Sequence, residues 1–394
     1  MNLKINTLVL LLCCYCFAFS NNDIYFHKIS VEQGLSQFSV ITIYQDEFGS
    51  LWFGTREGVN KYNGNSIEVI LPTLTNSKIP ENIILNICGD HQGHVYIQSQ
   101  NGVNEYNLHT STIRSIIQNS VNAIAYGSHN LWIAENNILF SYKDGTKKEY
   151  SRIESIGSPI CSITETSDEN IYLGTISSGV YIINKKKEVI QILPNASQVS
   201  SIFEDSKKNK WIATCEEGVY KIDTNQSITN YRANSAVPEQ SISSNYVRAI
   251  CEDNKETIWI GSDKGLDKLI PTSDSFTHYN AEKNTSLFLS NESVWALTKD
   301  SYGTIWIGTY FGGVNYFNPE ANFYTYHDLQ NGSFLNKPFP IISNIIRHDQ
   351  QSIFLCTEGS GLVYYDLSTK RYNVFLSDKN KPNSLIANNI KAAY

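Results

Sequence analysis

The chain has 394 residues, a net charge of −7 and a pI near 5.7, and its Lys and Arg residues are spread along its length. A duplex nucleic-acid binder needs a concentrated basic face, so this composition excludes that class. With 24 Tyr, 17 Phe and 6 Trp against a single Met, the chain is rich in side chains suited to half-buried strands, which predicts an all-β protein.

The N-terminus has the features of a secretory signal. Lys4 precedes an apolar run from Leu8 to Phe19, and Ala18 and Ser20 are the small residues that a signal peptidase reads. The run is shorter than the roughly 20 residues that a membrane-spanning helix needs. We therefore expect residues 1–20 to be a cleaved signal peptide. A lipoprotein signal is the less favoured alternative, because no small residue precedes the first cysteine.

A pattern of about forty residues then recurs along the chain. Each copy has an apolar strand around an aromatic anchor, a tight turn and an alternating strand, as in Thr304 to Phe317. The anchors, which lie 36 to 48 residues apart, are Trp52, Tyr96, Trp132, Tyr172, Trp211, Trp259, Trp306 and Phe354. This period predicts a β-propeller of four-stranded blades, with the anchors packed between successive blades.

The copies share further positions. An acid lies six residues before the anchor in five of them: Asp46, Asp90, Asp205, Asp253 and Asp300. An Asp at the first position of a type I turn accepts backbone N–H bonds, which indicates a structural role. A glycine in the second turn is expected to have a positive φ: Gly58, Gly102, Gly179, Gly218, Gly265, Gly312 or Gly361. Apolar pairs before the acid, such as Val40 with Ile43 and Ile342 with Ile345, predict a short buried strand.

The repeats also predict the domain organisation. Residues 21–325 are expected to form a seven-bladed propeller, whose last blade is completed by the strand Ile24 to Ser30 so that no edge is exposed. Residues 326–394 then begin a second propeller, which the strand Phe323 to Tyr326 would close in the same way. A ninth repeat opens at Asn383 and stops before its acid, so we expect the chain to be a fragment of a longer protein.

The segments Gly34 to Ser36, Gln45 to Thr55 and Trp306 to Tyr316 resemble the two-component-regulator propeller repeat, in particular the periplasmic sensor region of hybrid two-component system proteins. The resemblance covers residues 24–394. It implies a family architecture of two seven-bladed propellers, an immunoglobulin-like domain, one transmembrane helix, and cytoplasmic histidine kinase, receiver and DNA-binding modules. It also implies that the ligand is a breakdown product of a complex glycan and that its binding switches on genes for carbohydrate use.

An enzymatic function is the alternative from a different class. Glycosidases use paired carboxylates, but one equivalent acid in the same turn of each blade indicates structure, as in the Asp-box of sialidases. His91 and His94 lack a third ligand, so no metal and no other cofactor is expected. The mature chain has five cysteines, an odd number, and most lie in apolar strand patterns typical of small buried side chains. A secreted propeller lyase would need His, Tyr or Glu converging at the central opening; an interaction scaffold is the third alternative.

Ligand-binding residues are expected in the second-turn loops, because loops on a rigid scaffold commonly carry binding sites. The loop residues that the repeat does not require are Arg56, Glu57, Glu216, Glu217, Asp263, Lys264, Tyr310, Phe311 and Glu358. Of these we single out four: Arg56, Tyr310, Phe311 and Glu358. Tyr310 and Phe311 offer aromatic surface for a sugar ring.

The sequence thus predicts a non-enzymatic, periplasmic sensor region of a hybrid sensor histidine kinase of the inner membrane. Its ligand would be a glycan-derived oligosaccharide or monosaccharide. We expect a homodimer formed through the full ectodomain, no contact of this region with nucleic acid, and membrane attachment only through C-terminal segments beyond this chain.

Overall fold

The computed structural model describes residues 24–70, 83–154, 157–270, 272–281, 288–320, 341–349, 351–369 and 371–393. The chain divides into two compact units, Met1–Asn322 and Phe323–Tyr394. The predicted signal peptide and the predicted strand Phe323 to Tyr326 lie outside the described residues. Within the described ranges, no helix is both long enough and apolar enough to cross a membrane.

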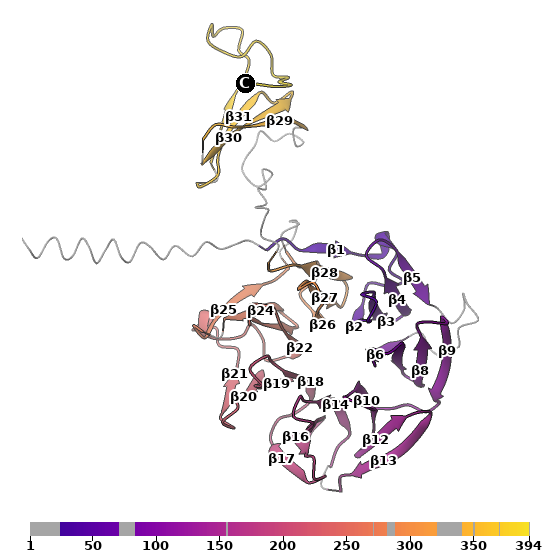
Figure 1. Ribbon diagram of the computed structural model, residues 1–394. Coiled ribbons are helices and arrows are strands. Elements are labelled where there is room, and N and C mark those ends of the chain that lie inside the picture. Colours follow the sequence, from indigo (N-terminus) through magenta and orange to yellow (C-terminus); the bar gives the residue numbers. More distant parts are fainter. Residues whose placement is uncertain are drawn as a thin grey trace, which may run out of the picture. The chain divides into compact units, whose positions relative to one another are not determined.

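The described part of the first unit contains seven four-stranded antiparallel sheets, which are arranged in a ring (Figure 1). The innermost strands are β2 (Val40–Gln45), β6 (Ile84–Gly89), β10 (Ala123–Tyr126), β14 (Ile160–Glu165), β18 (Val199–Glu204), β22 (Val247–Glu252) and β26 (Val294–Lys299). The second strands are β3 (Leu51–Thr55), β7 (His94–Ser99), β11 (Leu131–Glu135), β15 (Ile171–Thr175), β19 (Lys210–Thr214), β23 (Ile258–Ser262) and β27 (Ile305–Thr309). We number these sheets blades 1 to 7 in chain order.

The outer half of each blade is a second hairpin. The third strands are β4 (Gly58–Tyr62), β8 (Gly102–Asn107), β12 (Ile138–Lys143), β16 (Val180–Ile183), β20 (Val219–Ile222), β24 (Gly265–Ile270) and β28 (Val314–Phe317). The fourth strands are β5 (Ile67–Ile70), β9 (Thr112–Ile117), β13 (Thr146–Arg152), β17 (Val189–Leu193), β21 (Ile228–Tyr231), β25 (Ser275–Tyr279) and, in blade 7, β1 (His27–Ile29). Two short 3₁₀ helices, η1 (Val31–Gln33) and η2 (Pro238–Gln240), lie in connections.

Because neighbouring strands are antiparallel, the connections alternate between the two faces of the ring. The turns between the first and second strands share one face with the turns between the third and fourth strands; we call it the turn face. The loops between the second and third strands share the other face with the blade-to-blade crossings; we call it the crossover face. The candidate ligand-binding residues of the first unit lie on the crossover face.

The ring is closed by the N-terminal strand, as the sequence predicts. β1 pairs with β28 in antiparallel register, with His27 opposite Tyr316 and Ile29 opposite Val314. Phe26 packs edge-on against Phe317, with ring centroids 5.2 Å apart. Blade 7 therefore takes three strands from the end of the unit and one from its beginning, which leaves no unpaired edge there.

The core lies between blades. Trp52 of blade 1 is fully buried in one cluster with Ile84 and Ile87 of blade 2. Trp259 packs in the same way against Val294 of blade 7, and Trp306 packs across the closure against Val40 of blade 1. The predicted packing of anchors between successive blades is confirmed. Each blade is thus held by its neighbours, as in other repeat folds.

The second-turn glycine of blade 7 differs from the prediction. Gly58, Gly179 and Gly218 have the expected positive φ, but in blade 7 it is Gly313, with φ of 75°, and not Gly312, that does. Gly312 is required for another reason: a Cβ on it would lie 2.2 Å from the Oγ of Ser290. The two glycines of the pair therefore serve a left-handed turn and a close packing contact separately.

The second unit contains, within its described residues, one sheet of β29 (Ile341–Arg347), β30 (Ser352–Glu358), β31 (Leu362–Asp366) and β32 (Tyr372–Phe375). Ile345 of β29 is 59% exposed, although Ile43 at the same repeat position packs in the core of the ring. The prediction of a buried first strand is therefore wrong for this sheet. The physical reason is that the described residues of this unit include no neighbouring blade to cover it.

The described cysteines are free, and burial raises the pKa of their thiols, to about 12 for Cys88 and Cys161. The cysteines are therefore small packing residues kept as thiols, in agreement with the sequence analysis.

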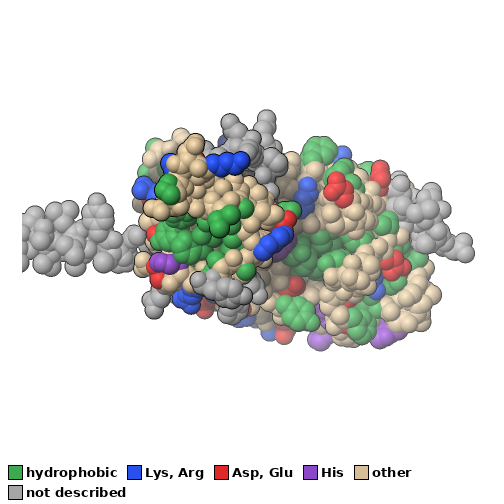
Figure 2. Space-filling model, turned by 90° about the horizontal axis from the view of Figure 1, so that it is seen from above, with side chains coloured by type: hydrophobic (Ala, Val, Ile, Leu, Met, Phe, Trp, Pro, Cys, Tyr) green, Lys and Arg blue, Asp and Glu red, His purple; other side chains and the backbone are tan. Residues whose placement is uncertain are grey.

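On the surface seen in Figure 2, Lys and Arg are dispersed among Asp, Glu and uncharged side chains.

One crossing loop depends on a histidine. Asp267 of β24 is fully buried; its Oδ2 accepts the backbone N–H of Ser243 at 2.8 Å, and its Oδ1 lies 2.7 Å from Nδ1 of His278. The hydrogen bond to Asp267 raises the pKa of His278 above its ordinary value of about 6.5. The protonated ring donates from Nδ1 to Asp267 and from Nε2 to the carbonyl of Pro238.

Because the pKa of His278 is raised in the folded state, its contribution to stability is fully present below about pH 6.5 and is lost as the pH rises through the raised folded pKa. We expect the melting temperature of the wild type to fall over that interval relative to His278→Gln, measured by thermal unfolding at a series of pH values. Parallel pH curves for the two proteins would contradict this.

Candidate ligand-binding site

The repeated acids of the turn face are structural, as predicted. In blade 6 the Oδ1 of Asp253 accepts the backbone N–H groups of Lys255 and Thr257, at 2.8 and 3.0 Å, and its Oδ2 accepts the indole N–H of Trp259 at 3.0 Å. Asp46, Asp205 and Asp300 make the same bonds with their own turns and tryptophans. The acid and the anchor six residues later therefore form one buried unit, in which the carboxylate is occupied by the turn and the indole.

Two blades that lack one member of this pair use a different hydrogen-bond partner. Blade 3 has no acid in its turn, and the indole N–H of Trp132 donates instead to Glu165 of blade 4 at 2.6 Å. Blade 2 has Tyr96 at the anchor, and the Oδ2 of Asp90 lies 2.8 Å from Nδ1 of His94. His94 is therefore part of a turn, and no cluster of three or more potential metal-binding groups occurs among the described residues.

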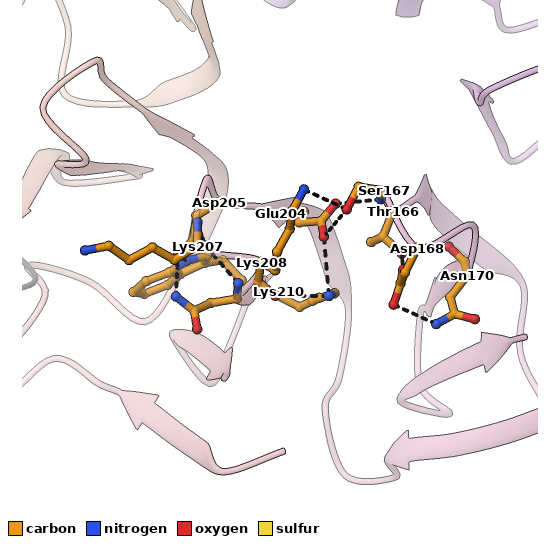
Figure 3. Close-up of polar contacts among 11 residues, drawn as sticks. Thr166, Ser167, Asp168, Asn170, Glu204, Asp205, Lys207, Lys208 and Lys210 are labelled. Atoms are coloured by element: carbon orange, nitrogen blue, oxygen red, sulfur yellow. Dashed lines mark hydrogen bonds and ion pairs between the residues drawn. The ribbon is translucent and has the colours of Figure 1, made fainter. Parts of the chain in front are cut away.

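The residue before the acid joins neighbouring blades on the turn face (Figure 3). Glu204 of blade 5 accepts the backbone N–H of Ser167 of blade 4 at 2.7 Å and its hydroxyl at 2.9 Å. Glu252 binds Ser206 in the same way, and Gln45 accepts the N–H of Ser301 across the closure. At these three junctions, contacts on the turn face thus fix one blade to the next.

On the crossover face, three of the four selected residues lie together. The guanidinium carbon of Arg56, in the loop of blade 1, lies 5.0 Å from the ring centroid of Tyr310 in the loop of blade 7. Phe311 packs edge-on against Tyr310 with centroids 4.1 Å apart, and it is 62% exposed. The loop is held by its Thr309, whose Oγ1 accepts the N–H of Gly312 and donates to the carbonyl of Gly313.

Two further residues extend this group. Tyr310 stacks on Trp295 with centroids 5.1 Å apart and an interplanar angle of 14°. The guanidinium carbon of Arg248 lies 4.4 Å from the Trp295 centroid and 4.7 Å from that of Tyr246. The resulting stack, which we name the crossover stack, consists of Arg56, Tyr310, Phe311, Trp295, Arg248 and Tyr246. Its guanidinium–aromatic contacts are favourable electrostatic contacts.

Ser293 fixes the inner end of the crossover stack. Its Oγ lies 2.8 Å from a guanidinium nitrogen of Arg248, which donates to it, and 3.1 Å from the indole N–H of Trp295. Arg248 and Trp295 occupy the second position of β22 and β26, so both come from the innermost strands. The sequence carried a signal for Trp295, because it is the one tryptophan outside the anchor register. No signal showed that Arg248 would lie beside it.

The remaining loop residues have other contacts. Glu216 and Glu217 accept hydrogen bonds from the hydroxyl and the backbone N–H of Ser197, and Glu217 also accepts one from Tyr220. Glu358 lies in the second unit, where its carboxylate pairs with Lys391. Glu358 therefore belongs to a separate unit from the crossover stack.

The comparisons with known proteins concern the repeats of the ring. The model of the two component regulator propeller matches residues 34–57, 241–264 and 289–311, each of which runs from a crossing loop to the loop between the second and third strands. The chain carries two-component regulator propeller repeats. Each matched repeat contains the turn aspartate and its tryptophan. Two of the matched repeats end in a crossover-face loop, one with Arg56 in blade 1 and the other with Tyr310 and Phe311 in blade 7.

Similar structures include the extracellular domains of two hybrid two component systems of B. thetaiotaomicron. One has a TM-score of 0.67 and 24% identity, with 93% of this chain and 50% of that chain covered; the other has 0.64 and 20%, with 93% and 49% covered. A streptogramin B lyase has a TM-score of 0.59 and 14% identity, with 76% and 99% covered. At these identities the likeness shows the propeller fold alone, and the chain spans about half the length of the two extracellular domains.

A curated relative, "Histidine kinase P4" of Formosa agariphila, is 45% identical over 49 residues, which is 12% of this chain and 4% of that protein. The likeness to a protein described as a histidine kinase thus covers a short segment only.

Proposed function

We propose that this chain is the ligand-sensing, extracytoplasmic part of a hybrid two-component sensor histidine kinase. The regulator propeller repeats and the likeness to two such ectodomains support the assignment. In this proposal residues 1–20 direct export to the periplasm, the sheet of β29 to β32 begins a second propeller, and the full ectodomain forms a homodimer. The kinase and the membrane span belong to segments beyond this chain.

The crossover stack is the observation on which the proposed binding site rests. Its members are not needed by the repeat, and they combine exposed aromatic surface with two guanidinium groups. Phe311 is the most exposed ring and would stack on the apolar face of a sugar, because the faces of Tyr310 and Trp295 already carry contacts within the stack. Arg56 would then bind a carboxylate or sulfate of that sugar, since a guanidinium matches such groups in geometry and charge.

The proposed ligand is therefore a glycan-derived oligosaccharide that carries an acidic sugar. Its binding would favour one arrangement of the propellers or subunits over another, and this population shift would be transmitted to the kinase, which controls genes for carbohydrate use. The ligand must bind the two arrangements with different affinity for this to occur.

Titration calorimetry of the full chain against neutral and uronate-containing oligosaccharides tests the proposal. We expect a uronate-containing oligosaccharide to bind, and Phe311→Ala to weaken its binding about tenfold, or about 1.4 kcal/mol. Tyr302→Ala is the matched control, because Tyr302 is an aromatic residue 77% exposed on the turn face. Equal affinities of the two variants, or no binding of any uronate-containing oligosaccharide, would refute the site.

A further inference from the structure

A cavity of about 380 Å³ opens between blades 2 and 3 on the turn face, away from the crossover stack. Its volume lies within the range of small-molecule sites, roughly 300 to 1,000 Å³. Tyr96 and Glu105 of blade 2 line it together with Tyr126 and Tyr142 of blade 3. Tyr96, Glu105 and Tyr142 are buried, so these side chains form the inner wall.

Blade 2 departs from blades 1, 5 and 6 at the positions that face this cavity. In blades 1, 5 and 6 the anchor is a tryptophan, and the lysine opposite it on the third strand lies over the indole, for example Lys268 over Trp259 at 5.6 Å. In blade 2 the anchor is Tyr96, and the residue opposite it is Glu105. A smaller ring and a shorter side chain replace the indole and the lysine, which leaves the space that the cavity occupies.

Three tyrosine side chains line the cavity. Tyr96, Tyr126 and Tyr142 make no side-chain hydrogen bond with any other described residue. Burial raises the pKa of all three, so each remains a neutral hydroxyl that donates one hydrogen bond and accepts others. None of the three hydroxyl oxygens is among the solvent-inaccessible unpaired atoms of the described residues, so they are open to the cavity, where a polar occupant can pair with them.

The buried charged groups of the wall, in contrast, are already compensated, whereas the lining residues His129, Lys143 and Asp144 are exposed. Both oxygens of Glu105 accept hydrogen bonds from the guanidinium of Arg114, at 2.7 and 3.0 Å. Asp90 is satisfied by its own turn and by His94. At the inner wall an occupant therefore meets neutral hydroxyls rather than an unpaired charge, which favours an uncharged molecule with several hydroxyl groups.

We propose that this cavity binds a small neutral polyhydroxylated molecule, a monosaccharide or disaccharide, whose hydroxyls pair with Tyr96, Tyr126 and Tyr142. This site is separate from the crossover stack and does not depend on it. It differs in ligand class as well, since the crossover stack carries two guanidinium groups and is assigned an acidic sugar.

Saturation-transfer NMR and titration calorimetry of the full chain test the site, with glucose, galactose, cellobiose and lactose as neutral probes and glucuronate as the charged probe. We expect at least one neutral sugar to bind and glucuronate to bind more weakly. Tyr126→Phe and Tyr142→Phe, which keep the rings, should each weaken the neutral sugar about three- to tenfold, the loss expected for one hydrogen bond.

Two control variants show whether the loss of affinity is specific to this cavity. Tyr150→Phe alters a tyrosine that packs on Trp132 between blades 3 and 4, and it should leave the affinity unchanged, as should Phe311→Ala. Because the cavity hydroxyls have no hydrogen-bond partner among the described residues, Tyr126→Phe and Tyr142→Phe should melt at or above the wild-type temperature. The proposal is overturned if no neutral sugar binds, if the double variant binds as the wild type does, or if both single variants melt lower.

Discussion

Replacing Asp253 with Ala is expected to lower the free energy of unfolding by about 3 to 5 kcal/mol. Asp253 is 4% exposed and accepts three hydrogen bonds, two of which come from the buried N–H groups of Thr257 and the indole of Trp259. A buried donor left without a partner costs about 1 to 3 kcal/mol. Urea unfolding of the wild type and the variant measures the difference.

Asp223→Ala is the matched control for this substitution. The Oδ1 of Asp223 accepts the N–H groups of Asn225 and Ser227, both at 2.8 Å, in an exposed turn without an indole. Water can replace the carboxylate there, so a loss of about 1 kcal/mol is expected. In a Trp259→Phe background the cost of Asp253→Ala should shrink, since Phe has no indole N–H to be left unpaired. If Asp253→Ala costs no more than Asp223→Ala, the buried unit of acid and tryptophan is not a major source of stability.

Gly313→Ala is expected to destabilise the closure of the ring by about 3 kcal/mol. Gly313 has a φ of 75°, where an L-residue is disfavoured by roughly 1 to 2 kcal/mol. A Cβ there would also lie 2.3 Å from the carbonyl oxygen of Ile29 in β1, so the closing strand would have to move. Forced overpacking of this kind typically costs about 1 to 3 kcal/mol.

Gly64→Ala separates the two contributions. Gly64 has a φ of 93°, but a Cβ on it would meet no atom within 4 Å, so only the backbone penalty applies. Thermal unfolding should rank Gly313→Ala well below Gly64→Ala, and amide hydrogen exchange should show faster exchange in β1 for Gly313→Ala alone. Equal melting temperatures and equal protection of β1 would mean that the contact with Ile29 does not hold the closure.

Much of the fold follows from the sequence because the repeat is local. The anchor spacing predicts the blades, and the strand before the first repeat predicts the closure by β1. The distinction between Gly312 and Gly313 does not follow, because both occupy the same turn and only the packing of Ser290 separates their roles. The hydrogen bond from Trp132 to Glu165 is likewise invisible in the sequence, since it replaces a contact within one blade by a contact between two.

The binding residues were predictable in part. Arg56, Tyr310 and Phe311 stand out because the repeat does not need them, but they come from blades at opposite ends of the ring's sequence. Their proximity, and that of Arg248 and Trp295, depends on the ring closing between blades 7 and 1. The cavity between blades 2 and 3 arises from what is missing, a tryptophan and a lysine, and an absence from a degenerate repeat carries little signal by itself.

The pairing of β1 with β28 also sets an order in time. His27 is synthesised 289 residues before its partner Tyr316. Blades 1 to 6 are each built from contiguous strands, so their hairpins can form as the chain emerges, whereas blade 7 must wait for both ends. The junction of blades 7 and 1, which brings Arg56 close to Tyr310, is therefore the last part of the ring to assemble. The crossover stack is completed only in chains in which this junction has formed.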